Sequence, residues 1–290
     1  YMPDFSTFFS VNTVSTALIF ELIVALRLRI RKIVLASSQA VYGEGTYACE
    51  RHGLFHPGCR TDEQLSSGDW EIHCPHCDRQ VLPQPIDETS AHPHTPYGIS
   101  KLTSELTSNN LGRKYNIPVV NMRYSIVQGP RNSFYNAYSG IARIFTMRLL
   151  HGQRPICYED GRQLRDYVYV GDVARANLLA LEDERTDFAS FNVAGQTSTS
   201  VSDYARLTAR ICGVDVEPLI SGDYRFGDTR HTFSSWEALG RLGWRPEIPL
   251  ESFLEEYVTW VRKQDDLENF YSRSERTMRS AGVIRTASMQ

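Results

Sequence analysis

Hydrophobic positions in the first half of the chain fall into alternating helical and extended runs. Residues 11–28 are dense in Ala, Leu, Ile and Val with few helix breakers, which predicts a largely buried helix. The short β-branched run at 32–37 predicts a buried strand of a parallel sheet. A helix over 96–115 and a strand over 117–122 repeat this order. Two helix-then-strand units indicate the α/β class.

The second half of the chain continues to mix helical and extended patterns. The predicted strands lie near 155–158, 166–170 and 191–195, and the predicted helices over 137–150, 173–181, 201–212, 234–242 and 250–263. The polar residues 265–290 have no such pattern, and we expect them to form a disordered tail.

The segment 46–88 interrupts the alternation. Its periodicity is lost and Cys, His, Pro and Gly accumulate, over a length far beyond the ~2–6 residues usual between strand and helix, so it is an insertion. Five potential metal ligands lie in it: Cys49, His52, Cys59, Cys74 and Cys77.

The ligand spacing in this insertion is typical of zinc. Cys74 and Cys77 form a two-residue knuckle, and Cys49 with His52 repeats that spacing. We expect one structural zinc bound by Cys49, Cys74 and Cys77, with either His52 or Cys59 as the fourth ligand. The metal would stabilise a segment with few apolar anchors. A loose loop with free thiols is the alternative.

Composition limits the possible partners. Lys and Arg number 31 against 34 Asp and Glu, for a net charge of -3, so nucleic acid is not an expected partner. The most apolar stretch, 17–26, is only half of the ~20 residues of a membrane span and contains Glu21, so no membrane is expected. No basic segment followed by an apolar core marks a secretory signal. These observations favour a cytoplasmic protein.

A tyrosine and a lysine stand four residues apart at the start of the predicted helix 96–115. Tyr97 and Lys101 therefore share one face of that helix. A phenol has a pKa of about 10, which a neighbouring cation lowers by stabilising the phenolate. The pair can then act as an acid or base near neutral pH. An ordinary surface pair in a long helix has the same spacing.

Six segments in order along the chain strengthen the chemical interpretation. They are Asn12-x-x-x-Thr16, Ser37 to Gly43, Tyr97-x-x-x-Lys101, Arg123-Tyr124, Arg165-Asp166-Tyr167 and Arg225-x-Gly227-Asp228. Together they resemble the extended short-chain dehydrogenase/reductase family of nucleotide-sugar epimerases and dehydratases, from residue 1 to about 261 apart from the insertion. The resemblance implies a Rossmann-like, doubly wound parallel sheet and NAD as cofactor.

The resemblance also implies roles for the reacting residues. Tyr97 corresponds to the general base that takes the proton from a sugar hydroxyl while hydride leaves that carbon for NAD. Lys101 corresponds to the lysine that holds the nicotinamide ribose and lowers the tyrosine pKa. Ser38 corresponds to the residue that hydrogen-bonds the reacting oxygen, with a plain turn serine as the alternative.

Further residues match cofactor and substrate positions of the family. Asn12, Ser37 and Tyr124 correspond to residues at the cofactor site, although Asn12 could instead cap a helix. Arg165 and Arg225 correspond to arginines that bind the nucleotide diphosphate, a role suited to a planar cation with several donors. Solvated salt bridges are the alternative for both arginines.

The two residues that follow Ser38 help to decide which reaction is expected. Dehydratases of the family normally place an Asp-Glu pair there, and decarboxylating members keep the Glu, whereas this chain has Gln39 and Ala40. Neither side chain can transfer protons at pH 7. The resemblance thus favours NAD-dependent epimerisation, at C4 of a UDP-hexose or UDP-hexuronate. A nucleotide-sugar reductase or dehydratase and a degenerate, non-catalytic nucleotide-sugar-binding protein are the alternatives.

The family's N-terminal cofactor motif does not occur in the sequence. Members begin with a strand and a Gly-x-x-Gly-x-x-Gly turn that lets the cofactor pyrophosphate approach a helix N-terminus. We expect the first strands and the adenine half of the NAD site, roughly 70–90 residues, to be missing, as in a fragment or a truncated homologue.

The resemblance and the insertion together give the expected organisation. It comprises a partial NAD-binding domain at 1–45 and 89–130, the insertion at 46–88, and a smaller α/β part at 131–264 that mainly binds the nucleotide sugar. Family members commonly pair through the helices predicted here at 11–28 and 96–115, so a homodimer is expected.

Overall fold

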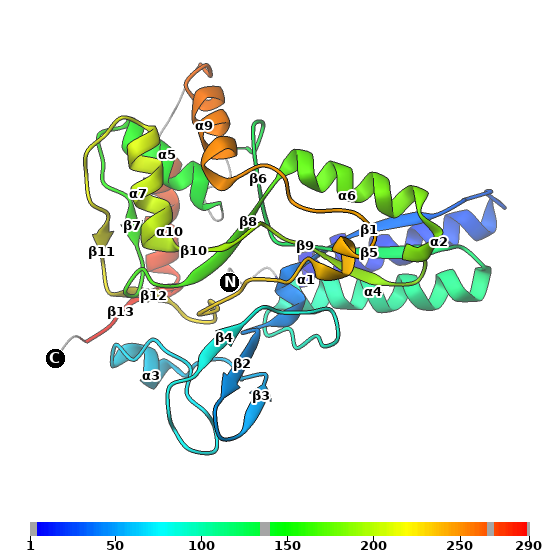
Figure 1. Ribbon diagram of the computed structural model, residues 1–290, viewed down its shortest axis with the longest axis horizontal. Coiled ribbons are helices and arrows are strands. Elements are labelled where there is room, and N and C mark those ends of the chain that lie inside the picture. The colour runs from blue at the N-terminus through cyan, green and yellow to red at the C-terminus, as the bar shows by residue number, and fades with distance from the viewer. Residues whose placement is uncertain (1–4, 134–139, 266–269, 289–290) are drawn as a thin grey trace.

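The computed structural model describes residues 5–133, 140–265 and 270–288. Its central sheet contains three parallel strands in the order β1-β5-β9, namely β1 (Ile33–Ser38), β5 (Val119–Tyr124) and β9 (Ser190–Val193). Helix α4 (Pro96–Tyr115) lies on one side of this sheet and α6 (Val170–Glu182) on the other (Figure 1). The expectation of a doubly wound parallel sheet is therefore confirmed.

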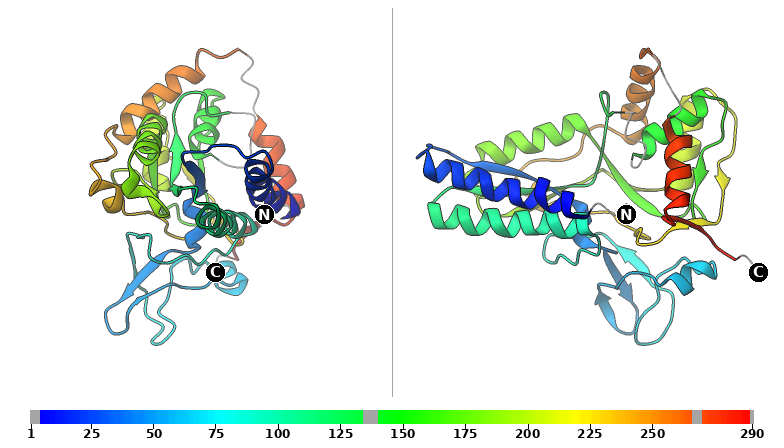
Figure 2. Two further views of the ribbon diagram at one scale, coloured as in Figure 1. Left: turned by 90° about the vertical axis from the view of Figure 1, so that its right-hand side faces the viewer. Right: turned by 180° about the vertical axis from the view of Figure 1, so that it is seen from behind.

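The first long helix differs from its prediction. It comprises α1 (Phe5–Phe8), the π-helix η1 (Phe9–Val14) and α2 (Ser15–Ala25), which run alongside α4 (Figure 2). Only Thr16, Phe20 and Ile23 of α2 are buried, so the prediction of a largely buried helix is wrong.

The exposed side of this helix is apolar. Eight of its exposed large hydrophobic side chains, including those just beyond its end, are Phe5, Val11, Val14, Leu18, Ile19, Leu22, Val24 and Leu26. Phe20 and Ile23 pack against Ile117 and Val119, and the centroid of the Phe8 ring lies 5.7 Å from that of the Tyr97 ring, whereas the eight side chains named above stay exposed in the described part of the chain. By length and composition alone, the helix spanning residues 5–25 could cross a membrane, so the shorter stretch 17–26 understated its extent.

The second part of the chain packs helices around short strands. The helices are α5 (Ile141–Leu150), α7 (Val201–Ile211), α8 (Glu237–Gly240) and α9 (Leu250–Val261). The strands are β6 (Ile126–Gln128), β7 (Ile156–Cys157), β8 (Leu164–Tyr169), β10 (Ser198–Ser200), β11 (Leu219–Ile220) and β12 (Asp223–Arg225). Strand β8 pairs with β6 and β10, and β7 pairs with β11. Residues 137–139 of the helix predicted over 137–150 lie outside the described residues. Helix α8 is shorter than the helix predicted over 234–242.

The described part of the C-terminal segment contains secondary structure, where a disordered tail was predicted. They form α10 (Phe270–Ser280) and β13 (Ile284–Thr286), which pairs antiparallel with β12. Met278, Val283 and Ile284 are buried together, and Arg279 pairs with Asp223 at 2.6 Å. So few apolar anchors in a polar segment leave no periodic signal in the sequence.

The insertion forms a small lobe below the sheet in the view of Figure 1. Strands β2 (Thr46–Cys49), β3 (Gly53–Phe55) and β4 (Leu82–Gln84) pair antiparallel in the order β3-β2-β4, with α3 (Asp62–Ser66) beside them. The buried core of the lobe is small and comprises Tyr47, Cys49, Ile72, Cys74 and Val81.

Candidate functional site

The start of α4 lies against the segment that follows β1. Thr95 caps this helix by accepting a hydrogen bond from the Gly98 N–H at 3.0 Å. A Cβ atom at position 98 would lie 2.3 Å from the carbonyl oxygen of Ala40, so a side chain there would force the two segments apart. Glycine therefore permits the close approach that brings Tyr97 to the same wall as Ser38.

Tyr97 and Ser38 line one cavity of about 610 Å³. Ser38 Oγ also accepts the Ala40 N–H at 3.1 Å and so caps the short helix η2 (Gln39–Tyr42). Lys101 Nζ donates to the Ala36 carbonyl oxygen at 3.0 Å and lies 5.9 Å from the centroid of the Tyr97 ring. Burial lowers the pKa of Lys101. The three predicted catalytic residues thus gather at the carboxyl end of β1.

A second cavity of about 700 Å³ adjoins the first. The two share six lining residues, Ala40, Tyr97, Ser125, Ile126, Arg165 and Thr229. Both cavities fall within the usual size of small-molecule sites, about 300–1,000 Å³. Together they can hold a ligand that reaches from Tyr97 toward the second part of the chain.

Two predicted arginines line the second cavity and are fixed by protein contacts. Arg165 donates to the carbonyl oxygens of Thr229 at 2.6 Å and Arg230 at 2.8 Å. The Arg225 guanidinium carbon lies 5.0 Å from the centroid of the Tyr158 ring. For Arg165, bonding to backbone carbonyl oxygens takes the place of the salt bridge considered as an alternative. Two fixed guanidinium groups suit an anionic ligand such as a diphosphate.

Two lining residues had no signal in the sequence. Arg143, on α5, lines the second cavity and donates to the Ser133 carbonyl oxygen at 2.6 Å, and burial lowers its pKa. His94 lines the first cavity three residues before Tyr97, and burial lowers the pKa of its imidazole. An arginine in an amphipathic helix and a histidine in a polar linker look ordinary in sequence, so only the fold identifies them.

The predicted cofactor residues take different positions. Tyr124 lines the first cavity and donates its hydroxyl to Asn177 Oδ1 at 2.7 Å. Asn12 lies inside the π-helix η1, where Nδ2 donates to Ser100 Oγ of α4 at 2.9 Å, so the helix-cap alternative is wrong. The contact between Asn12 and Ser100 joins the first helix to the helix that carries Tyr97.

Ser37, like Asn12 and Lys101, is not among the residues that line the two cavities. Its hydroxyl donates to Glu105, which also pairs with Arg123 at 2.8 Å. Arg123 donates in turn to the Tyr42 hydroxyl at 2.9 Å. Ser37 therefore belongs to a buried polar network behind the site.

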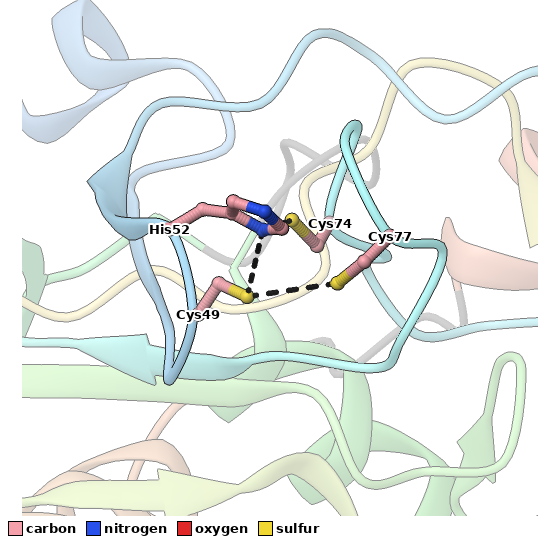
Figure 3. Close-up of side chains that lie close together, drawn as sticks. All are labelled: Cys49, His52, Cys74 and Cys77. Atoms are coloured by element: carbon pink, nitrogen blue, oxygen red, sulfur yellow. Dashed lines mark hydrogen bonds between the residues drawn. The ribbon is translucent and has the colours of Figure 1, made fainter.

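Four of the five predicted metal ligands converge in the insertion (Figure 3). The ligand atoms of Cys49, His52, Cys74 and Cys77 all lie within 4.8 Å of one another. Cys59 is exposed and is not part of this group, so of the two candidates for the fourth position the structure selects His52. The ligand chemistry of the cluster is that of a structural zinc site.

The fold and the cavity define a class of protein. Ser38, at the end of β1, and Tyr97 and Lys101, in the first turns of α4, lie together at the carboxyl end of a doubly wound parallel sheet, where dinucleotide-dependent α/β enzymes bind their ligands. Residues 75–194 match the model described as the NAD dependent epimerase/dehydratase family.

Comparison with individual proteins agrees with this match. The dTDP-L-rhamnose 4-epimerase of Burkholderia thailandensis is 34% identical over 261 residues, which are 89% of this chain and 70% of that protein. The UDP-glucose 4-epimerase structure from Thermotoga maritima superimposes with a TM-score of 0.67 at 30% identity, over 87% of this chain and 69% of that one. The Thermus thermophilus UDP-glucose 4-epimerase complex with NAD gives 0.67 at 26%, over 89% and 71%. This chain belongs to the NAD dependent epimerase/dehydratase family, which confirms the resemblance.

Proposed function

We propose that the protein is an NAD-dependent epimerase that inverts C4 of a hexose carried on a nucleoside diphosphate. The observation that carries this proposal is the shared wall of the two cavities, where Tyr97 stands between Ser38 and the arginine-lined space. One end of the ligand site offers an acid/base pair, and the other offers cations for a diphosphate. The three relatives compared above are named as 4-epimerases of nucleotide sugars, which supports the same reaction, whereas others are named as 4,6-dehydratases.

The residues at the first cavity fit the reacting end of the cofactor and the sugar. Bound NAD would supply reversible hydride transfer at the sugar carbon. Tyr97 takes the proton from the sugar hydroxyl and later gives it back, while Ser38 hydrogen-bonds the same oxygen. Lys101 would hold the ribose beside Tyr97, and Tyr124, which lines the first cavity, would form part of the cofactor wall. The tyrosine ends each turnover in its starting protonation state.

Arginine side chains would orient the nucleotide. Arg165 and Arg225 present fixed guanidinium groups to the second cavity, and Arg143 faces the same space. A diphosphate accepts charge-assisted hydrogen bonds from such groups. Binding the nucleotide firmly while the sugar remains loosely held lets the keto sugar turn between the two hydride transfers.

Dehydration is the second candidate reaction. The Gln39 amide donates to Asp166 at 2.7 Å and to Ser234 at 2.8 Å, and Ala40 has only a methyl group, so neither supplies a proton. His94, however, faces the cavity, and its buried Nδ1 has no hydrogen-bond partner among the described residues. Because burial lowers the pKa of His94, its neutral imidazole would act in elimination as a base.

We also propose that two copies pair through the first helix and α4. The apolar side of the first helix remains exposed, and Leu106 of α4 is 62% exposed. Burying these side chains against a second copy would remove them from water. The same surface would otherwise have to contact lipid or another protein.

The reaction is tested by incubating the protein with catalytic NAD and, separately, dTDP-L-rhamnose, UDP-glucose and UDP-glucuronate. Proton NMR and mass spectrometry of the products distinguish the candidates. The proposal predicts an inverted C4 with unchanged mass for at least one sugar. Loss of water from the sugar would instead identify a dehydratase, and stoichiometric consumption of NADH a reductase. Binding without turnover would identify a non-catalytic protein.

A further inference from the structure

The cysteine and histidine cluster has the dimensions of a tetrahedral zinc site. Zinc–sulfur bonds of about 2.3 Å place two thiolates of a tetrahedron about 3.8 Å apart. Cys49 Sγ and Cys77 Sγ are 3.8 Å apart, and His52 Nδ1 lies 3.5 Å from Cys49 Sγ and 3.3 Å from Cys74 Sγ. One ion can therefore contact all four ligand atoms without rearrangement of the fold.

The backbone around the ligands is also arranged as a metal knuckle. Cys74 N–H donates to the Arg79 carbonyl oxygen at 2.8 Å, and Asp78 N–H donates back to the Cys74 carbonyl oxygen at 2.9 Å. This turn carries Cys77 between them. Cys49, at the end of β2, and Cys74 are both buried in the small core of the lobe.

The lobe is connected to the rest of the molecule by buried charges. Glu71, three residues before Cys74, pairs with Arg230 at 2.6 Å, and Arg60 pairs with Glu159 at 2.9 Å. The Arg230 side chain is completely buried and also contacts Glu159 at 2.8 Å and Asp160 at 2.7 Å. Buried charges of this kind are stable only while every partner stays in place.

The same group of charged residues also contacts the segment that forms one wall of the two cavities. Arg60 donates to the Asp228 carbonyl oxygen at 2.9 Å, next to Thr229, whose carbonyl oxygen binds Arg165. Asp228 and Thr229 line the second cavity, and Thr229 and Thr232 line the first. A continuous chain of contacts thus runs from the metal ligands through the insertion to the residues that surround the ligand site.

We infer that Cys49, His52, Cys74 and Cys77 bind one structural Zn²⁺, and that this ion fixes the insertion as a support for the cavity wall formed by residues 228–232. The metal part of this inference stands on the cluster alone. Its effect on nucleotide-sugar binding rests on the proposed function. The zinc takes no part in the reaction, because its four protein ligands would complete its coordination.

Metal content is the first test. Elemental analysis of the full chain, purified under reducing conditions without added metal, should give about one zinc per chain. Cys74→Ser should lower this below about a tenth, whereas Cys59→Ser, in the same lobe but outside the cluster, should leave it unchanged. His52→Cys should retain zinc, since four thiolates also form a structural site. Wild-type protein that stays metal-free after dialysis against zinc would overturn the inference.

The link to the cavity is tested without relying on a mutant that folds. Zinc is removed from wild-type protein with a chelator, and hydrogen exchange is followed for peptides that cover 228–232 and, as a control, β5. Exchange at 228–232 should rise by about tenfold or more while β5 stays protected. Unchanged exchange at 228–232 would refute the support role.

Ligand affinity separates this inference from the proposed function. Calorimetry with UDP should show at least about fivefold weaker binding after zinc removal, with recovery on adding zinc back. If no form binds UDP while zinc content and exchange behave as expected, only the proposed function fails. If wild-type protein binds UDP and zinc removal leaves the affinity unchanged, the support role fails instead.

Discussion

The parallel sheet and the insertion are held in place by different interactions. In β5, Val119, Val120 and Met122 are fully buried, and each such side chain contributes about 1.5–3 kcal/mol of hydrophobic stabilisation. The insertion buries few apolar residues, two of which are cysteines, and depends on Arg60, Arg230 and their acidic partners.

The two regions therefore contribute to the ligand site in different ways. The end of β1 and the start of α4 bring Ser38, Tyr97 and Lys101 together, where an error in position would slow the proposed reaction. The insertion shapes the distant wall of the ligand site through charged contacts. Damage to the sheet side should therefore lower turnover, whereas damage to the insertion should lower stability and affinity.

The largest effect is expected from Arg230→Ala. This change leaves Glu159 buried without one of its two cationic partners and should lower the free energy of unfolding by about 3–5 kcal/mol. Urea denaturation measures this loss of unfolding free energy. Arg210→Ala, which removes the exposed pair with Glu251, is the control and should cost no more than about 1 kcal/mol. Equal losses in the two variants would contradict the role given to buried charge.

Tyr97→Phe should lower kcat by at least about 100-fold while the affinity for UDP stays the same, because only the proton-transferring hydroxyl is lost. Steady-state kinetics and calorimetry measure the two quantities. Tyr115→Phe, at the other end of α4, removes an exposed hydroxyl and should leave kcat unchanged. Full turnover in Tyr97→Phe would remove this residue from the mechanism.

Glu71 makes the stability of the insertion depend on pH. The hydrogen bond from His231, with help from Arg230, lowers the pKa of Glu71 from 4.5 to about 2. Burial lowers the pKa of His231, and its Nδ1 accepts the Leu164 N–H, so a neutral ring donates through Nε2. The stability that Glu71 contributes is therefore present above pH 4.5 and is lost as the pH falls toward 2.

Glu71→Gln should consequently destabilise the protein by about 1.5–3 kcal/mol at pH 7, the usual value of hydrogen bonds to charged groups. The gap between variant and wild type should close as the pH falls below 4.5, since only the wild type then loses its carboxylate. Urea denaturation at a series of pH values measures this. A gap that remains constant down to pH 3 would show that Glu71 does not titrate as described.

The smallest effect is expected at the apolar side of the first helix. Leu18→Asp places a charge in the proposed dimer contact and should weaken self-association by about tenfold or more, as measured by sedimentation velocity. Leu178→Asp, an exposed leucine on α6, should leave association unchanged. A wild-type protein that remains monomeric at high concentration would refute the pairing.

Local signals allowed much of the sheet region to be predicted. Helix α4 begins and ends where predicted, because Thr95 and Pro96 start it and Asn116, in a left-handed conformation, ends it. The tyrosine and lysine spacing correctly predicted that Tyr97 and Lys101 lie close together on α4, and their catalytic role stays a prediction. Burial of the first helix was predicted wrongly, since an apolar sequence does not reveal whether its contacts lie within the chain.

The insertion was less predictable because its organisation depends on contacts between distant residues. The choice of His52 over Cys59 follows from the fold of the lobe, and nothing in the spacing determined it. The partnership of Glu71 with Arg230 joins residues 159 positions apart, and it has no local signal. The structure of the C-terminal segment likewise depends on the pairing of β13 with β12.

The most direct test of the proposed epimerisation follows a deuterium label at C4 of the sugar that proves to be the substrate. The hydride that leaves C4 returns to the same carbon on its other face, and Tyr97 exchanges only the oxygen-bound proton. The inverted product should therefore keep the deuterium at C4 and take up no hydrogen from water at that carbon. Proton NMR recorded during turnover measures this. Replacement of the label by solvent hydrogen would contradict the account, because it would mean that C4 loses a proton rather than a hydride.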